Sequence, residues 1–144
     1  MTKPHLQSLS IKNFRFFKER TTFNIAPINV ITGTNSSGKS SVLKALRLLS
    51  ESSQKHGLRK LNLSSKTHQL GDFEQVKNKY SDNKYISFSY QISNTENLFW
   101  GVTDVFYVHL IFGPQYGALD NRLLELSISD GRQPEGTCFA FEMA

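Results

Sequence analysis

The sequence has too few cysteines for an internal disulfide, because Cys138 is the only one among 144 residues. It lies in the strand-like run Thr137 to Phe141, where a buried structural thiol is a simpler interpretation than a nucleophile. Long hydrophobic runs are also missing, and the longest, Val105 to Phe112, is far too short to span a bilayer. The N-terminus has no apolar segment of the kind found in signal peptides. We therefore expect a cytoplasmic protein with no membrane contact.

No strong excess of one charge is present either. The formal net charge is +5, and the Lys and Arg residues are scattered along the chain. This excess permits contact with a nucleic acid, but a modest and scattered excess is more typical of a solvated surface. Apolar residues make up only 38%, yet 11 Phe and 5 Tyr supply large side chains for a core. The length fits one domain.

The most specific pattern present is G-x-x-x-x-G-K-S at residues 33–40, the pattern of a phosphate-binding P-loop. Gly33 and Gly38 allow the backbone to bend tightly around an anion with its N–H groups pointing inward. Lys39 can reach the β- and γ-phosphates of a nucleotide, and the Ser40 hydroxyl can bind Mg²⁺. The residues predicted to bind the nucleotide in this loop are Gly33, Asn35, Ser36, Ser37, Gly38, Lys39, Ser40 and Ser41.

Both flanks of the pattern agree with this interpretation. The β-branched run Ile28 to Thr32 predicts a buried parallel strand that leads into Gly33. From Lys39 to about Ser52 helix formers dominate, and an apolar stripe recurs at helical spacing: Val42, Ala45, Leu46 and Leu49, widened by Leu43 and Leu48. A bound phosphate would thus lie at a helix N-terminus, which favours negative charge.

Two parts of a working ATPase are missing from the sequence. Gly113 follows the apolar run Val108 to Phe112, and the run Leu123-Leu124 before Glu125 is too short, so neither supplies the acidic residue that would hold Mg²⁺ and orient water. A glycine-rich signature of the Leu-Ser-Gly-Gly type is also missing, since Leu126 to Gly131 is better explained as a strand and a turn. These residues can hold a nucleotide but are poorly equipped to hydrolyse it.

The chain divides into a P-loop core (1–52), an irregular part (53–84) and an antiparallel β-rich part (85–144). Gly71 to Glu74 could open a short helical turn, and Asp130-Gly131 signals a hairpin. The predicted strands besides 28–32 are 5–11, 21–25, 85–92, 105–112, 122–129 and 137–142, with a further apolar segment at 98–100. The expected fold is an α/β P-loop NTPase lobe, with a P-loop helix and an antiparallel β-rich subdomain. Because residues 139–144 are strand-like to the end, we expect a truncated N-terminal lobe.

Residues 9–17 and 28–46 together resemble the N-terminal lobe of ABC-type ATPases outside the transporters, a group that includes the SMC, RecF and OLD ATPases. The filling Thr34-Asn35-Ser36-Ser37 resembles most closely the OLD-like AAA-family ATPases of bacteria, and residues 70–76 resemble a segment of one branch of them. The resemblance covers residues 6–50, extends in part to about 92 and is absent beyond.

The resemblance implies further roles. Asn13 and Arg15 lie where related proteins bring side chains near the nucleotide, although a basic turn anchored in the core by Phe14 and Phe16 explains them equally well. Gln75, or alternatively Gln69, corresponds to a glutamine that contacts Mg²⁺. The resemblance also favours ATP over GTP, and it implies a head-to-head homodimer of the full-length protein in which one subunit's signature faces the other's P-loop.

We therefore expect an ATP- and Mg²⁺-dependent enzyme whose output acts on DNA, in repair or phage defence, with DNA or an effector protein as partner. One alternative is a nucleotide-binding sensor module without turnover. The other is a basic protein that binds nucleic acid directly. The strand-rich second half argues against kinases and GTPases, which alternate strand and helix.

Overall fold

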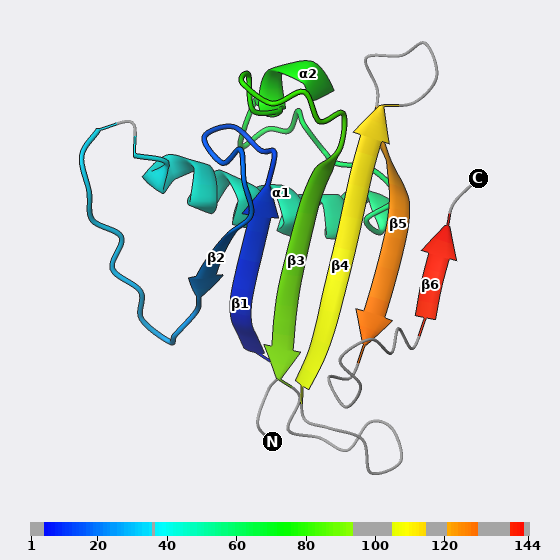
Figure 1. Cartoon of the computed structure of the whole chain (residues 1–144), viewed down its shortest axis with the longest axis horizontal. Coiled ribbons are helices and arrows are strands. Elements are labelled where there is room, and N and C mark those ends of the chain that lie inside the picture. Colours follow the sequence, from blue (N-terminus) through cyan, green and yellow to red (C-terminus); the bar gives the residue numbers. More distant parts are fainter. Residues whose placement is uncertain (1–4, 36, 94–104, 115–120, 130–138, 143–144) are drawn as a thin grey trace.

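The main element is a six-stranded sheet in the strand order β2-β1-β3-β4-β5-β6, and every described strand pair is antiparallel (Figure 1). The computed structural model describes residues 5–35, 37–93, 105–114, 121–129 and 139–142. Strands β3, β4, β5 and β6 lie side by side in the order in which they occur in the sequence. The prediction of an antiparallel, β-rich second half is thereby confirmed for the described residues. The strands are β1 (His5–Lys12), β2 (Thr21–Asn24), β3 (Ile86–Ser93), β4 (Val105–Pro114), β5 (Asn121–Ser129) and β6 (Phe139–Glu142).

Each of these strands lies within a few residues of a predicted one. The predicted segment 98–100, the hairpin at Asp130-Gly131, the thiol of Cys138 and Ser36 of the glycine-rich loop lie outside the described residues. The predicted class needs one correction: helix and sheet occur together as expected, but the described residues contain no parallel pair.

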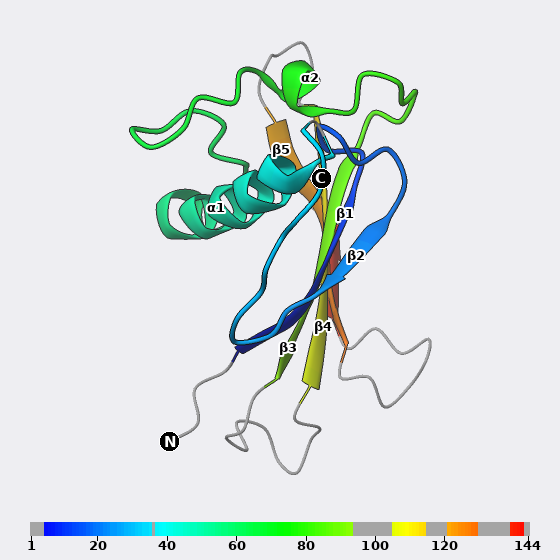
Figure 2. The same cartoon turned by 90° about the vertical axis from the view of Figure 1, so that its left-hand side faces the viewer.

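Two helices accompany the sheet. Helix α1 (Lys39–His56) crosses one face, and the short helix α2 (Phe73–Val76) caps one end of it (Figures 1 and 2). The predicted helix is confirmed and continues four residues further, until Gly57 closes it in a left-handed conformation with φ 56°. The predicted turn near Gly71 is confirmed as α2. No helix in the described part of the chain is long and apolar enough to cross a membrane.

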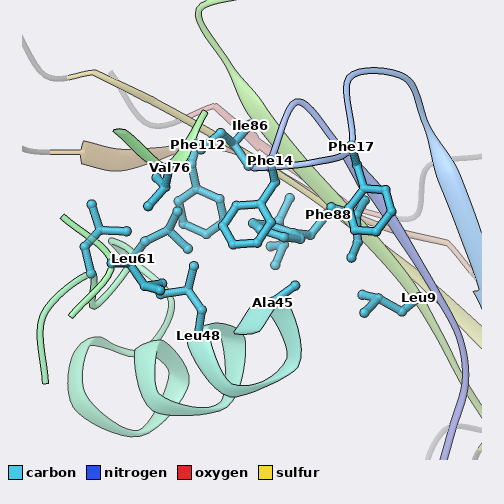
Figure 3. Packing of buried hydrophobic residues seen from close by; sticks show 14 of the residues in the cluster. Leu9, Phe14, Phe17, Ala45, Leu48, Leu61, Val76, Ile86, Phe88 and Phe112 are labelled. Atoms are coloured by element: carbon cyan, nitrogen blue, oxygen red, sulfur yellow. The ribbon is translucent and has the colours of Figure 1, made fainter. Parts of the chain in front are cut away.

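The hydrophobic core lies between α1 and the sheet (Figure 3). Phe14 packs edge-on against Phe88, and Phe88 against Phe112, with ring centroids 5.5 and 6.2 Å apart. The irregular segment after α1 closes the upper end of this core with Leu61, Leu63, Leu70, Phe73 and Val76, which are all buried. The segment predicted as irregular thus forms part of the core.

The buried stripe of α1 differs from the predicted one. Val42, Ala45 and Leu48 face the sheet and are at most 4% exposed. Leu46 and Leu49 are only partly buried, and Leu43 points to solvent with 60% of its surface exposed. Six of the eight residues from 42 to 49 are apolar, so more than one face of the helix could be the buried one. The position of the sheet selects which face is buried.

The predicted parallel strand at 28–32 is wrong for the described structure. After Ile25, whose N–H bonds to Gln7 O at 2.7 Å, the chain leaves the sheet as an extended excursion (Figure 1). Ile28 and Val30 are 84% and 82% exposed. A β-branched run becomes a strand only where a neighbour accepts and donates its backbone hydrogen bonds, and no described segment pairs with it.

The sheet face opposite α1 is polar and carries a half-buried histidine, His109. Burial lowers the pKa of His109, and the nearby positive charge of Arg20 lowers it further, while Glu125 acts in the opposite direction. Ser89 Oγ lies 2.7 Å from His109 Nδ1.

This shift predicts acid sensitivity. As the pH falls below the ordinary histidine value of about 6.5, the unfolded chain binds the proton first, so the folded state loses stability. The melting temperature of the wild type should therefore fall more between pH 7.5 and 5.5 than that of His109→Gln, which keeps a polar group facing Ser89. If the melting temperatures of the two proteins fell equally between these pH values, His109 would not be the source of the acid sensitivity.

Candidate functional site

The first part of the site is the glycine-rich loop at residues 33–38, which delivers the chain to α1. Gly38 adopts φ 89° and is the N-cap residue, and no side chain caps the helix and no acidic residue occupies its first turn. The first N–H groups of a helix have no partner within the helix, and its dipole attracts anions. The start of α1 therefore offers donors to a negatively charged ligand.

Lys39 contacts the backbone of the glycine-rich loop. Its Nζ donates to the carbonyl oxygens of Gly33, at 2.6 Å, and Thr34, and lies 3.4 Å from Ser37 Oγ. A phosphate that enters the loop must offer oxygen atoms in place of these carbonyls. The ammonium group is thus already held at the loop.

The turn between β1 and β2 forms the second part of the site. Phe14 and Phe17 exchange two backbone hydrogen bonds of 2.9 Å, which leaves Arg15 and Phe16 at the tip. Arg15 has φ 50°, a left-handed conformation that is costly for a residue with a side chain. Phe17 and Phe14 are buried while Phe16 is 55% exposed, so the predicted anchors Phe14 and Phe16 are corrected to Phe14 and Phe17.

Residues 75–80 form the third part and tie the turn in place. Arg15 N donates to Val76 O at 2.7 Å, and Asn78 Nδ2 donates to Arg15 O at 2.8 Å. The remaining polar atom of the Asn78 side chain accepts from Tyr80 N at 3.0 Å. These contacts fix the tip of the turn against the segment that follows α2.

The three parts enclose an open cavity of about 530 Å³ at the start of α1. Its cationic lining residues are Arg15, Lys18, Lys77 and Lys79, and no acidic residue lines it among the described residues. Glu74 pairs with Lys77 at 2.8 Å but points largely to solvent. The rest of the lining is Phe16, Gly38, Ser40, Ser41, Gln75, Asn78 and Tyr80. A cavity with this charge suits a polyanion such as a nucleoside triphosphate.

The structure brings several predicted site residues together. Arg15, Gly38, Ser40, Ser41 and Gln75 all line the cavity. Gly33 and Asn35 are exposed in the loop outside it, and Ser37 is held there beside Lys39.

Asn13 lies elsewhere. It is fully buried, and its side chain bonds to Asn83 O, Tyr85 O and Asn78 N at 2.7, 2.8 and 3.3 Å. Its expected place near the nucleotide is therefore corrected to a place in the core beneath the turn.

The predicted Mg²⁺ ligands Ser40 and Gln75 both line this cavity, together with the oxygen-bearing side chains of Ser41, Asn78 and Tyr80. The Gln75 side-chain oxygen accepts from Asp72 N at 3.3 Å, and Gln75 N donates to Asp72 Oδ1 at 2.8 Å, which caps α2. Mg²⁺ usually keeps several waters and binds few protein ligands besides phosphates, so this small set fits it. Gln69 is exposed and lies in a bridge with Ser64, away from the cavity.

Sequence reasoning missed six lining residues: Phe16, Lys18, Lys77, Asn78, Lys79 and Tyr80. The available signal for residues 77–80 was the short polar and basic run Lys77-Asn78-Lys79-Tyr80 just after the helical turn. Only the fold shows that this run lies next to the turn at Arg15.

Gly38 supplies a test of the packing at this site. A Cβ at Gly38 would lie 2.7 Å from Phe16 Cδ1, whereas a Cβ at Gly57 would meet nothing within 4 Å. Both residues are left-handed. We expect Gly38→Ala to reduce the free energy of unfolding by about 2–4 kcal/mol, from the left-handed conformation and the overpacking together. Gly57→Ala should cost about 1 kcal/mol. Urea unfolding measures both, and equal losses would contradict a close contact between Gly38 and Phe16.

The comparison with known families agrees with this geometry. The family model described as AAA ATPase domain matches residues 5–105, which include the turn, the glycine-rich loop, α1 and the segment 75–80. A search of the curated proteins gave no match. The match supports a nucleotide-binding module of the ATPase type, and membership implies ATP binding, usually with Mg²⁺. Because the match covers more than half of the sequence, this chain belongs to the AAA ATPase domain family.

Proposed function

We propose that this chain is the ATP-binding lobe of an ABC-like ATPase of the SMC, RecF or OLD type, and that it binds Mg-ATP through the loop at 33–41. The observation that carries the proposal is the basic cavity at the uncapped start of α1, with Lys39 held at the loop beside it. In this role Lys39 and the N–H groups of α1 bind the phosphates. Arg15 and Lys18 add positive charge, and Ser40 and Gln75 hold the Mg²⁺, which neutralises phosphate charge.

We further propose that the lobe forms part of a larger assembly. The exposed apolar side chains of Ile28, Val30 and Ile31, together with that of Leu43 on α1, support this proposal. Covering large apolar side chains with a partner surface lowers the free energy of the system. A head-to-head homodimer of the full-length protein in the cytoplasm, with DNA or an effector protein as partner in repair or phage defence, fits this arrangement.

The alternative function is a nucleotide sensor without turnover. It is favoured by the lining of the cavity, which contains no carboxylate among the described residues that could orient an attacking water. Measurements of nucleotide binding and of phosphate release separate the two functions. A rise in melting temperature with Mg-ATP supports the site, and its absence at millimolar Mg-ATP would contradict it. Phosphate release above background then supports the enzyme, whereas release at background supports the sensor.

A further inference from the structure

The sheet face opposite α1 carries a second cavity of about 420 Å³, remote from the glycine-rich loop. Figure 2 shows α1 on one side of the sheet only. The cavity lies over the middle of β2, β1, β3, β4 and β5, where alternate side chains point away from the core. The proposed ATP-binding function uses none of these residues.

Two rows of neutral polar side chains cross this face at right angles to the strands. One row runs in register through Thr22, Ser10, Ser89, His109 and Ser127. Neighbours in it approach closely, with Ser10 Oγ 2.7 Å from Thr22 Oγ1 and Ser89 Oγ 2.7 Å from His109 Nδ1. Hydroxyl and imidazole groups both donate and accept hydrogen bonds, so this row can serve either type of ligand group.

The second row lies beside the first and runs through Ser8, Gln91, Tyr107 and Ser129. Gln91 Nε2 lies 3.5 Å from the Tyr107 hydroxyl oxygen, and Tyr107 is 46% exposed. A large aromatic ring that is half exposed on a sheet provides a platform for a planar ligand group.

The only charged side chain that lines this cavity among the described residues is Arg20. Arg20 is exposed and has no ion-pair partner in the described part of the chain. Glu125 lies on the same face, one row above His109, and does not line the cavity. The cavity therefore combines one free guanidinium group, a field of hydroxyls and an exposed ring.

We infer that this face binds single-stranded nucleic acid. Phosphates are contacted in proteins by Arg and by Ser, Thr, Gln and Tyr side chains, which is the composition of the two rows. Unpaired bases stack on aromatic rings that protrude from open antiparallel sheets, and Tyr107 offers such a ring. A neutral polysaccharide would use the hydroxyls and the ring but would leave Arg20 without a counter-ion.

The test is the fluorescence anisotropy of a labelled 20-nucleotide oligothymidylate, and of the matching oligouridylate, with the full chain at low salt. We expect a Kd in the range of roughly 1–100 µM. Tyr107→Ala should weaken binding about tenfold, while Tyr107→Phe should stay close to the wild type because it keeps the ring. Arg20→Gln should also weaken binding and should reduce the slope of log K against log salt by about 0.7.

Lys55→Gln is the matched control, because it removes another exposed cation, from the last turn of α1, far from this face. Equal losses in Lys55→Gln and Arg20→Gln would assign the binding to general surface charge and overturn the inference. A neutral glucan that displaces the oligonucleotide and binds with no salt dependence would also overturn it. Lys39→Ala should bind the oligonucleotide like the wild type, so a failure of the ATP site and a failure of this inference remain distinguishable.

Discussion

A Lys39→Ala variant is expected to lose the thermal stabilisation that Mg-ATP gives to the wild type. A ligand present at 100 times its Kd stabilises the folded state by about 2.7 kcal/mol. In a domain of this size this corresponds to a rise in melting temperature of roughly 5–10 °C. The Lys39 side chain already holds a positive charge against the carbonyls of Gly33 and Thr34. Its removal leaves the phosphates with backbone donors alone, so the shift should disappear. Differential scanning fluorimetry with and without Mg-ATP measures it.

Lys44→Ala is the control for this experiment. It removes the same charge from the same helix, but the carbonyls of Gly33 and Thr34 are held by Lys39 and not by Lys44. This variant should keep the full shift with Mg-ATP. If Lys39→Ala shows the same shift as the wild type, the nucleotide does not bind through this loop. If both variants lose the shift, the effect comes from the overall charge of α1.

An Asn13→Ala variant is expected to lower stability strongly and to leave nucleotide affinity almost unchanged. Asn13 is fully buried, and its amide satisfies Asn83 O, Tyr85 O and Asn78 N. Alanine would leave these backbone groups without a partner in the core, at about 1–3 kcal/mol for each group that finds no replacement. Asn13 also has φ 54°, a conformation that asparagine tolerates better than alanine. We expect a loss of about 3 kcal/mol in urea unfolding.

The nucleotide affinity of the same variant decides between the two roles of Asn13. Titration of a fluorescent ATP analogue, well below the melting temperature, should give a Kd within about twofold of the wild-type value. Asn35→Ala, on the exposed loop, should leave stability unchanged. A tenfold loss of affinity in Asn13→Ala without loss of stability would return Asn13 to the nucleotide site.

Much of the local structure could be predicted because its causes are local. Alternation of polar and apolar residues at 85–92 and the apolar run at 105–112 predict strands, and the structure has β3 and β4 there. An apolar period without Gly or Pro predicts the helix after Lys39, and α1 begins at that residue. The glycine-rich loop was recognisable because phosphate binding needs particular residue types at a fixed spacing.

The strand predicted at 28–32 failed for a reason that lies outside the segment. Its residues have the right β-propensity, but a strand exists only when another segment supplies its hydrogen bonds, and propensity contains no information on the partner. The stripe of α1 failed in a similar way, since the sheet selects Val42, Ala45 and Leu48 from a wider apolar surface. Asn13 is buried although we expected it near the nucleotide, and Phe16 is exposed although we expected it to anchor the turn in the core. The reason is that the turn exposes its tip and buries its base.

The sequence by itself determined most of the helices and strands and predicted a phosphate-binding loop at 33–40, because both depend on residues close together in the chain. Only the tertiary structure decided that Arg15, Lys18 and residues 75–80 surround the start of α1, and that hydroxyls from five strands form one face. These groupings join residues that lie tens of positions apart, and their proximity is set by strand register and by core packing. A pattern along the chain cannot encode such proximity, since it records only the spacing of residues in sequence.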